Sequence, residues 1–342
     1  MSMLDEVDFR ARYDKDDCIG LIGRQLEQLA SDLVPPVGLD PVRVNRVLVA
    51  GMGGSALASE LARVLWRDRL PWPVDICKDY DLPTYVDDQT LVICSSYSGS
   101  SEETLAALTT ARSAGAQVVC ITAGGNLLAT AQTEKLPFVA LPSGIQGRYG
   151  VLSGLVAWAV VAQALGVKGL VDELQVAGRA VVEAVASWAP EVPAADNDAK
   201  KLAEALLGKP IILYAGPTMS AIAQKWKVDF NENAKHTAWW NVLPEMNHNE
   251  LSGWGHPREH GLRVVELRSE LDHEQVRKRF EVMNRLISDR WAPVEVYVVG
   301  KTAAEQTVWA FMLGSYVSGY LAILNQVEIA TLPLVDKLKS QL

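Results

Sequence analysis

The chain has 342 residues, enough for two domains of ordinary size that each bury a core. Hydrophobic residues make up 49% of the chain and charged residues 21%, which is typical of a globular protein rather than a disordered one. The formal net charge of -9 argues against a nucleic-acid-binding protein, which needs a basic face. It does not exclude a local site for an anion, because clustered N–H groups can hold a phosphate in an acidic protein.

Residues 1–12 carry acids and no apolar run, so no signal peptide is predicted. No stretch is predicted to span a membrane, and the nearest candidate, residues 151–167, is short and favours a buried core helix. The cysteines form no CxxC pair, and they are predicted to be free thiols in a reducing compartment: Cys18, Cys77, Cys94 and Cys120. We therefore expect a cytoplasmic protein with no membrane partner.

The first half of the chain alternates between strand and helix patterns. Helical spacing predicts an amphipathic helix over residues 13–33, ended by two prolines. Short apolar runs predict strands at residues 47–50, 74–77, 90–95, 117–122 and 138–141. Helices are predicted near residues 55–66, 102–114, 127–133 and 152–165, the first of them capped by Ser55. Such alternation predicts a parallel sheet covered by helices on both faces.

The second half repeats this plan after a segment rich in Pro, Asp and Asn, residues 189–200, which is predicted to link two domains. Strands are predicted at residues 210–215, 263–267 and 294–299, and helices at residues 219–230, 273–286 and 303–325. The predicted fold class is α/β, with two Rossmann-like, doubly wound parallel sheets flanked by helices. The predicted domains are residues 1–185 with the leading helix, and residues 200–342 with a C-terminal helix.

Ionisable residues crowd into one part of this apolar chain. Two carboxylates, Glu232 and Glu250, bracket His248 within a short span. Trp239 and Trp240 lie between them in sequence and are predicted to shield a carboxylate from water. A glutamate becomes an effective base when it is partly desolvated or paired, so the combination suits acid–base chemistry.

The turn at residues 51–56, Gly-Met-Gly-Gly-Ser-Ala, fits the dinucleotide pattern G-x-G-x-x-G/A. Asp75 and Asp79 lie about where a ribose-binding acid would stand in such a site. The motif is short, however, and any strand-to-helix turn that approaches a phosphate needs glycines. Dinucleotide binding is therefore kept as an alternative.

The serine loop, residues 95–101, also follows a predicted strand and opens a helix. Ser96, Ser98 and Ser101 offer hydroxyl groups beside the free N–H groups of that helix. The loop has no lysine, which disfavours a triphosphate site, so it predicts a site for one compact phosphate. A serine-rich cap and turn without a ligand is the structural alternative.

The segment from Ser96 to Thr104, Ser-Tyr-Ser-Gly-Ser-Ser-Glu-Glu-Thr, resembles the phosphosugar loop of SIS (sugar isomerase) domains. Residues 231–235, residues 244–250 and the closing Leu338-Lys339 resemble segments of the bifunctional phosphoglucose/phosphomannose isomerases. The resemblance covers nearly the whole chain. It implies two SIS domains, a hexose 6-phosphate substrate, no cofactor, and a homodimer with shared active sites. The implied activity is isomerisation of glucose 6-phosphate, with mannose 6-phosphate as a secondary substrate, to fructose 6-phosphate through a cis-enediolate.

The resemblance also implies roles for single residues. Glu232 is the base that moves a proton between C1 and C2, and Arg148 stabilises the enediolate. His248, supplied across the dimer interface, and a lysine near the C-terminus assist ring opening; Lys339 fits that lysine best and Lys337 is the competitor. The implied phosphate-binding residues are Gly54, Ser55, Ser96, Ser98 and Ser101. Glu250 is expected to support the segment of His248.

Several departures and alternatives remain open. Ser100-Ser101 replaces the family's usual Asn-Thr, Gly147 replaces the proline before Arg148, and residues 330–333 depart from the usual D-P-T-P, which makes use of mannose 6-phosphate less secure. The site residues also have structural alternatives, such as pairing of Glu232 with Lys235. The rival function is a non-catalytic SIS module that senses a sugar phosphate. The remaining histidines show no metal-ligand spacing, so no metal site is predicted.

Overall fold

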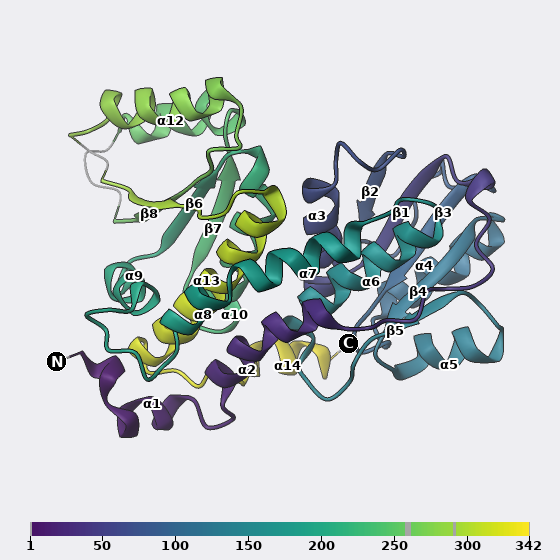
Figure 1. Ribbon diagram of the computed structural model, residues 1–342, viewed down its shortest axis with the longest axis horizontal. Coiled ribbons are helices and arrows are strands. Elements are labelled where there is room, and N and C mark those ends of the chain that lie inside the picture. The colour runs from purple at the N-terminus through teal and green to yellow at the C-terminus, as the bar shows by residue number, and fades with distance from the viewer. Residues whose placement is uncertain (1, 257–260, 290–291, 342) are drawn as a thin grey trace. The chain divides into compact units, whose positions relative to one another are not determined.

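The computed structural model describes residues 2–256, 261–289 and 292–341, and it describes Lys339 by its backbone only. The chain forms two compact units. The first unit is Gln25–Arg179, and the second unit combines Met1–Arg24 with Ala180–Leu342. Each unit is built around its own parallel sheet (Figure 1).

The first unit contains a five-stranded sheet in the order β2-β1-β3-β4-β5, with every neighbouring pair parallel. Its strands are β1 (Arg46–Gly51), β2 (Val74–Cys77), β3 (Thr90–Ser95), β4 (Gln117–Thr122) and β5 (Phe138–Ala140). All six residues of β3 are buried, as expected for a central strand covered on both faces. Gly51 pairs with Ser95 in register, so the two loops of interest leave the sheet side by side.

Helices flank this sheet. They are η2 (Gln25–Ala30), η3 (Pro41–Arg43), α3 (Gly53–Leu65), α4 (Glu102–Ser113), α5 (Gly125–Thr133), η4 (Gly147–Tyr149), α6 (Val151–Ala164) and α7 (Leu170–Ala180). Helix α6 packs against α3 so closely that a Cβ atom at Gly154 would lie 2.9 Å from Cβ of Ala58. This contact fixes the helix that begins at the glycine turn after β1.

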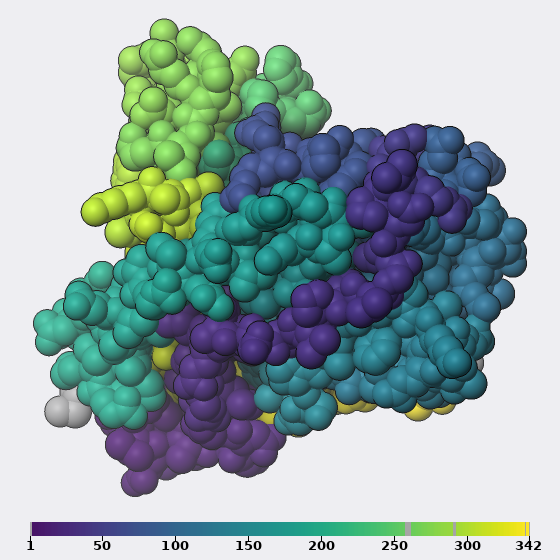
Figure 2. Space-filling model, turned by 45° about the vertical axis from the view of Figure 1, so that its right-hand side comes forward, coloured from purple at the N-terminus to yellow at the C-terminus, as the bar shows by residue number. Residues whose placement is uncertain are grey.

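The second unit contains a four-stranded parallel sheet in the order β7-β6-β8-β9. Its strands are β6 (Ile211–Ala215), β7 (Ala238–Val242), β8 (Arg263–Arg268) and β9 (Val294–Tyr297). Its helices are η1 (Met3–Asp5), α1 (Val7–Tyr13), α2 (Cys18–Arg24), α8 (Val182–Ser187), α9 (Asp198–Leu206), η5 (Pro217–Met219), α10 (Ser220–Glu232), η6 (Glu245–His248), α11 (Glu250–Trp254), α12 (Glu274–Leu286), α13 (Ala303–Leu324) and α14 (Pro333–Lys339). The light-green segment around α12 lies at the surface of this unit (Figure 2). The predicted α/β fold class is confirmed.

Helix α13 is the central helix of the second unit. With 22 residues it is long and apolar enough to cross a membrane, which the sequence prediction did not foresee. However, 94% of its apolar window is buried inside the protein, as in the core helix of a globular domain. At Gly314 the indole of Trp226 from α10 lies against the backbone and donates a hydrogen bond to the carbonyl of Ala310 (2.8 Å). Helix α10 is thereby held on α13.

The single leading helix predicted over residues 13–33 is wrong. The carboxylate of Asp14 accepts hydrogen bonds from the backbone N–H groups of Cys18 (2.6 Å) and Ile19 (3.1 Å), so a new helix, α2, starts there. Helix α2 packs on α13 at Gly319, which groups it with the second unit rather than with the predicted first domain. The predicted domain limits at residues 185 and 200 stay a prediction.

Two further local predictions are corrected by the structure. Strand β7 was not predicted, because its tryptophans were interpreted as a shield rather than as strand residues. Ser55 was predicted to be the N-cap of a helix, but the N-cap of α3 is Met52, three residues earlier. The hydroxyl of Ser55 is therefore available for another contact.

Candidate functional site

The turn after β1 and the serine loop after β3 are joined by a hydrogen bond, and further hydrogen bonds hold the serine loop itself. Ser55 Oγ accepts a hydrogen bond from the backbone N–H of Tyr97 (3.0 Å). Ser96 Oγ lies 3.0 Å from Ser101 Oγ and accepts a hydrogen bond from the N–H of Gly99 (3.1 Å). Because Ser55 uses a lone pair in this contact, its own hydroxyl hydrogen can still be donated to a ligand.

Two helices start at this cradle, which we define as residues 53–55 and 96–101. Helix α3 begins at Gly53 and α4 at Glu102, and neither N-cap side chain caps its own helix. The first N–H groups of a helix lack intrahelical acceptors and carry partial positive charge, so they favour an anion. Ser96 is buried and Ser98 is exposed, so the cradle reaches from the sheet to the surface. Its hydroxyl and N–H groups suit one tetrahedral phosphate.

Gly99 sets the path of the serine loop. Its φ is +69°, in the left-handed region, and a Cβ atom there would lie 1.8 Å from the carbonyl oxygen of Gly124. The next loop is tied to it, since Leu127 N–H donates a hydrogen bond to the Gly99 carbonyl (2.9 Å). No side chain fits at this position without moving one of the two loops.

Tyr97 links the cradle to the turn that carries Arg148. Cβ atoms at Gly147 and Gly150 would lie 3.4 Å from Cβ and 2.8 Å from the ring of Tyr97, respectively. A Cβ atom at Gly54 would lie 3.1 Å from the carbonyl oxygen of Gly147, so this turn also borders the start of α3. The structure thus brings Arg148 beside the predicted phosphate residues.

Arg148 is partly buried, and its guanidinium carbon lies 5.0 Å from the ring centre of Tyr149, a cation–π distance. A fixed, permanently charged guanidinium next to an anion cradle can stabilise negative charge that develops on a bound substrate. Sequence reasoning missed Tyr97, the residue that aligns these parts. A tyrosine between two serines gave no signal of that role, because its contacts lie some fifty residues away.

Asp75, one of the two acids considered for binding a ribose in a dinucleotide site, already has a hydrogen-bond partner. Asp75 Oδ2 accepts a short hydrogen bond from the hydroxyl of Tyr85 (2.6 Å). Burial, then this hydrogen bond, raises the pKa of Tyr85 to about 12, so the phenol remains a donor to Asp75 at neutral pH. Asp75 therefore already has a partner where a ribose hydroxyl would be expected.

The equivalent turn of the second sheet is filled by a carboxylate. Asp272 Oδ1 accepts hydrogen bonds from the N–H (3.1 Å) and the hydroxyl (2.7 Å) of Thr218, in the turn after β6. Asp272 is 4% exposed, and burial raises its pKa. A phosphate at this position would meet a negative charge, so the turn after β6 suits an anion less than the turn after β1 does.

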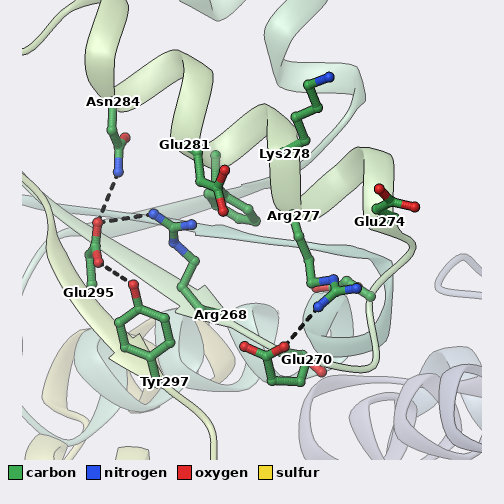
Figure 3. Close-up of a pocket in the computed structure, with 12 residues that line it drawn as sticks. Arg268, Glu270, Glu274, Arg277, Lys278, Glu281, Asn284, Glu295 and Tyr297 are labelled. Carbon is green, nitrogen blue, oxygen red and sulfur yellow. Dashed lines mark hydrogen bonds and ion pairs between the residues drawn. The ribbon is translucent and has the colours of Figure 1, made fainter.

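A cavity of about 690 Å³ lies at the carboxyl ends of β8 and β9, beneath α12 (Figure 3). Its two arginines are already paired: Arg268 with Glu266 and Glu295, and Arg277 with Glu270. The dashed contacts in Figure 3 show Glu295 held by three neighbours. Four glutamates line this cavity, so it offers less to a phosphate than the hydroxyl cradle does: Glu270, Glu274, Glu281 and Glu295.

Glu232 is the last residue of α10 and is half-buried. The residue after it, Asn233, donates a hydrogen bond from Nδ2 to Ser318 Oγ (2.9 Å) on α13. Asn231 donates from Nδ2 to the carbonyls of Lys227 (2.9 Å) and Ala238 (3.2 Å). The two asparagines thus fix the backbone on both sides of the carboxylate, which suits a base that must meet one carbon atom.

His248 and Glu250 have different environments. His248 is exposed at the end of η6. Glu250 accepts hydrogen bonds from the Tyr214 hydroxyl (2.5 Å) and from Asn241 Nδ2 (2.5 Å), and burial, then the bond to Glu250, raises the pKa of Tyr214. These hydrogen bonds tie the start of α11, directly after His248, to strands β6 and β7.

The predicted shielding by the two tryptophans is wrong. Trp239 and Trp240 are consecutive in β7, so their side chains point to opposite faces of the sheet. Trp239 is also 51% exposed. The two rings do not cover one carboxylate together.

Lys339 lies in α14, but its side chain is outside the described residues. Lys337, the competing lysine, is exposed in the same helix. In the described part of the chain, no group of three or more His, Cys, Asp or Glu side chains is placed to hold a metal ion. The four cysteines are free thiols, and burial raises the pKa of Cys120 to about 12, which makes it inert.

A family model described as "Bacterial phospho-glucose isomerase C-terminal SIS domain" matches residues 195–342. The chain is 35% identical to the bifunctional phosphoglucose/phosphomannose isomerase of Caldicellulosiruptor bescii over 87% of this chain and 90% of that protein. It is 31% identical to the protein of the same name from Aquifex aeolicus, over 92% of this chain and 93% of that protein.

Among solved structures, a "glucose-6-phosphate isomerase like protein" from Thermus thermophilus matches with a TM-score of 0.66. The match covers 99% of both chains at 18% sequence identity. At that identity the likeness establishes a shared fold and leaves the chemistry to the site residues.

Proposed function

The chain belongs to the family of bifunctional phosphoglucose/phosphomannose isomerases, and on this premise we propose that it converts glucose 6-phosphate and mannose 6-phosphate to fructose 6-phosphate through a cis-enediolate. It is an isomerase of sugar phosphates. The observation that carries the proposed mechanism is the serine cradle between two helix starts, with the turn of Arg148 packed against it.

The phosphate is proposed to bind the cradle through the hydroxyls of Ser55, Ser96, Ser98 and Ser101 and the backbone N–H of Gly54. Binding energy from this remote group positions the reacting carbons and is used at the reacting centre. The cradle also explains why a chain with net charge -9 can hold an anionic substrate, because it binds through helix dipoles and hydroxyl groups rather than through lysines.

Glu232 is proposed to take the proton from C2 and return it to C1, and Arg148 to stabilise the enediolate oxygen. One carboxylate suffices because the two carbons are adjacent, as for the glutamate base of triosephosphate isomerase. General acid–base help of this kind contributes roughly 10²–10⁴-fold to the rate. His248 and Lys339 are proposed to open the sugar ring before proton transfer.

The test of this function is a coupled assay of fructose 6-phosphate formation from glucose 6-phosphate and from mannose 6-phosphate, without added metal. Turnover of both sugars is expected. Binding of a sugar phosphate without turnover would favour the rival function, a non-catalytic SIS module. Turnover of glucose 6-phosphate alone would remove the second substrate, for which the departures around Arg148 and at residues 330–333 give a reason.

A homodimer with shared active sites is also proposed, in which His248 acts in the site of the partner subunit. The exposure of His248 on η6 supports this role. The test mixes two inactive variants, Glu232→Gln and His248→Gln, after unfolding and refolding together. In a two-fold dimer, half of the sites in a mixed dimer are intact, so about a quarter of wild-type activity should return. No recovery in verified mixed dimers would contradict shared sites.

The cytoplasm is the proposed location. The support is chemical: all four cysteines are free thiols, as expected in a reducing compartment. Fractionation of cells that produce the protein tests it, and recovery in the secreted or membrane fraction would contradict it.

A further inference from the structure

A charged pair lies buried on the helix that ends at Glu232. Lys225 is 2% exposed and Asp229 is 3% exposed. Lys225 Nζ donates hydrogen bonds to Asp229 Oδ2 and to Ser315 Oγ (3.0 Å), and it lies 4.2 Å from the ring centre of Phe311. Both Ser315 and Phe311 belong to the apolar helix α13.

Packing alone does not require this pair. Replacing a buried ion pair by apolar residues of similar volume is often neutral or stabilising, because taking two charges out of water is costly. Another close contact between α10 and α13 needs no charge, because the indole of Trp226 lies directly against Gly314. A second role for Lys225 and Asp229 is therefore reasonable.

The pair shares a helix face with the proposed base. Residues 225, 229 and 232 are four and three positions apart, so they follow one face of α10. Burial lowers the pKa of Lys225, and the charges of Asp229 and then Glu232 raise it. The interaction is reciprocal, so Lys225 favours the ionised form of Glu232 and Asp229 opposes it.

A hydrogen-bonded chain connects the pair to the end of the helix. The N–H of Asn233, the residue after Glu232, donates to the carbonyl of Asp229 (2.8 Å). Asn233 Nδ2 donates to Ser318 Oγ, which in turn donates to the carbonyl of Ser315 (2.7 Å). The backbone at Glu232 and the ammonium of Lys225 thus rest on the same stretch of α13.

Neighbouring elements add few charges. Within the described residues, α13 presents Phe311, Ser315 and Ser318 to this face, and β7 and η5 carry no ionisable side chain. Strand β6 carries only Tyr214, which donates to Glu250. The other cation of α10 is Lys227, and Lys235 just beyond the helix donates to the carbonyls of Glu328 and Ile329 (3.1 Å for the latter).

We propose that Lys225 and Asp229 form a positioning pair, in which each charge balances the effect of the other on the ionisation of Glu232 and the pair holds Glu232 where it can act as the base. The proposal rests on the proposed role of Glu232. Each charge alone would move the acidic limb of the pH profile, and in opposite directions.

The test is the pH profile of kcat/KM for glucose 6-phosphate. Asp229→Asn leaves the ammonium uncompensated and should move the acidic limb to lower pH, by about half a pH unit or more. Lys225→Met leaves the carboxylate and should move it to higher pH. The double variant should return close to wild type. The substrate phosphate titrates alike in every variant, so only differences between variants count.

The control is Lys227→Met, which removes one positive charge from a partly exposed position of the same helix and should leave the limb in place. If Lys225→Met does not fold, comparison of Asp229→Asn with the double variant still isolates the effect of Lys225. Unchanged limbs in folded variants would overturn the inference. An active Glu232→Gln variant would instead overturn the proposed base, so the two failures are distinguishable.

Discussion

Replacement of Gly99 by alanine tests whether the position of the serine loop controls substrate binding. The new Cβ would lie 1.8 Å from the carbonyl oxygen of Gly124, whereas ordinary contact begins at 3.4 Å. One of the two loops must therefore move by roughly 1 Å or more, and a misplacement of that size can cost ~10²-fold in rate. A fall of kcat/KM of that order is expected, mainly through a higher KM.

Gly115 provides a matched control in the same unit. Its φ is +74°, close to the +69° of Gly99, but the nearest atom to its missing Cβ is 3.8 Å away, on Asp88. Gly115→Ala should therefore show only the left-handed backbone penalty, about 1–2 kcal/mol of stability, with a normal KM. Urea unfolding and steady-state kinetics of both variants separate the two effects. Equal KM values for the two variants would refute the link between loop position and phosphate binding.

Two further predictions concern single side chains. Ser55→Ala removes both the acceptor of the Tyr97 N–H and a proposed phosphate donor, so KM should rise with little change in kcat. The control Ser113→Ala, at an exposed helix end, should behave as wild type. A normal KM for Ser55→Ala would show that this residue does not bind the phosphate. Burial, opposed by Arg268, raises the pKa of Glu266 to about 7 in the folded protein. In the unfolded chain Glu266 ionises at lower pH, so the free energy of unfolding of the wild type falls as the pH rises through 7. Glu266→Gln should therefore gain up to roughly 3 kcal/mol relative to wild type between pH 4.5 and pH 8, measured by urea unfolding, and a pH-independent difference would contradict the raised pKa.

The strands and their loops were predictable because the alternation of short apolar strands with helices is local. Gly51 and Ser95 end neighbouring strands, so the sequence could place the glycine turn beside the serine loop. The hydrogen bond that joins them, from the Tyr97 N–H to Ser55, depends on where α3 begins. The helix starts at Gly53 rather than after Ser55 as predicted. Propensity alone does not resolve such a choice.

Other features depended on contacts between distant residues. The carboxylate of Asp272 fills the second turn by reaching Thr218, more than fifty residues away. The Lys225–Asp229 pair is visible as helical spacing, but only the packing of α13 shows that it is buried. Strand β7 was missed because tryptophans beside polar residues suit both a strand and an active-site wall.

The central claim, that Glu232 transfers the proton, is tested most directly by exchange of the C2 proton of glucose 6-phosphate with deuterated solvent, followed by NMR. Glu232→Gln should lose roughly 10²–10⁴-fold of the exchange rate while it still binds inorganic phosphate, because the cradle is untouched. Glu274→Gln, an exposed change in the same unit, should exchange as wild type. Exchange at the wild-type rate by Glu232→Gln would contradict the mechanism.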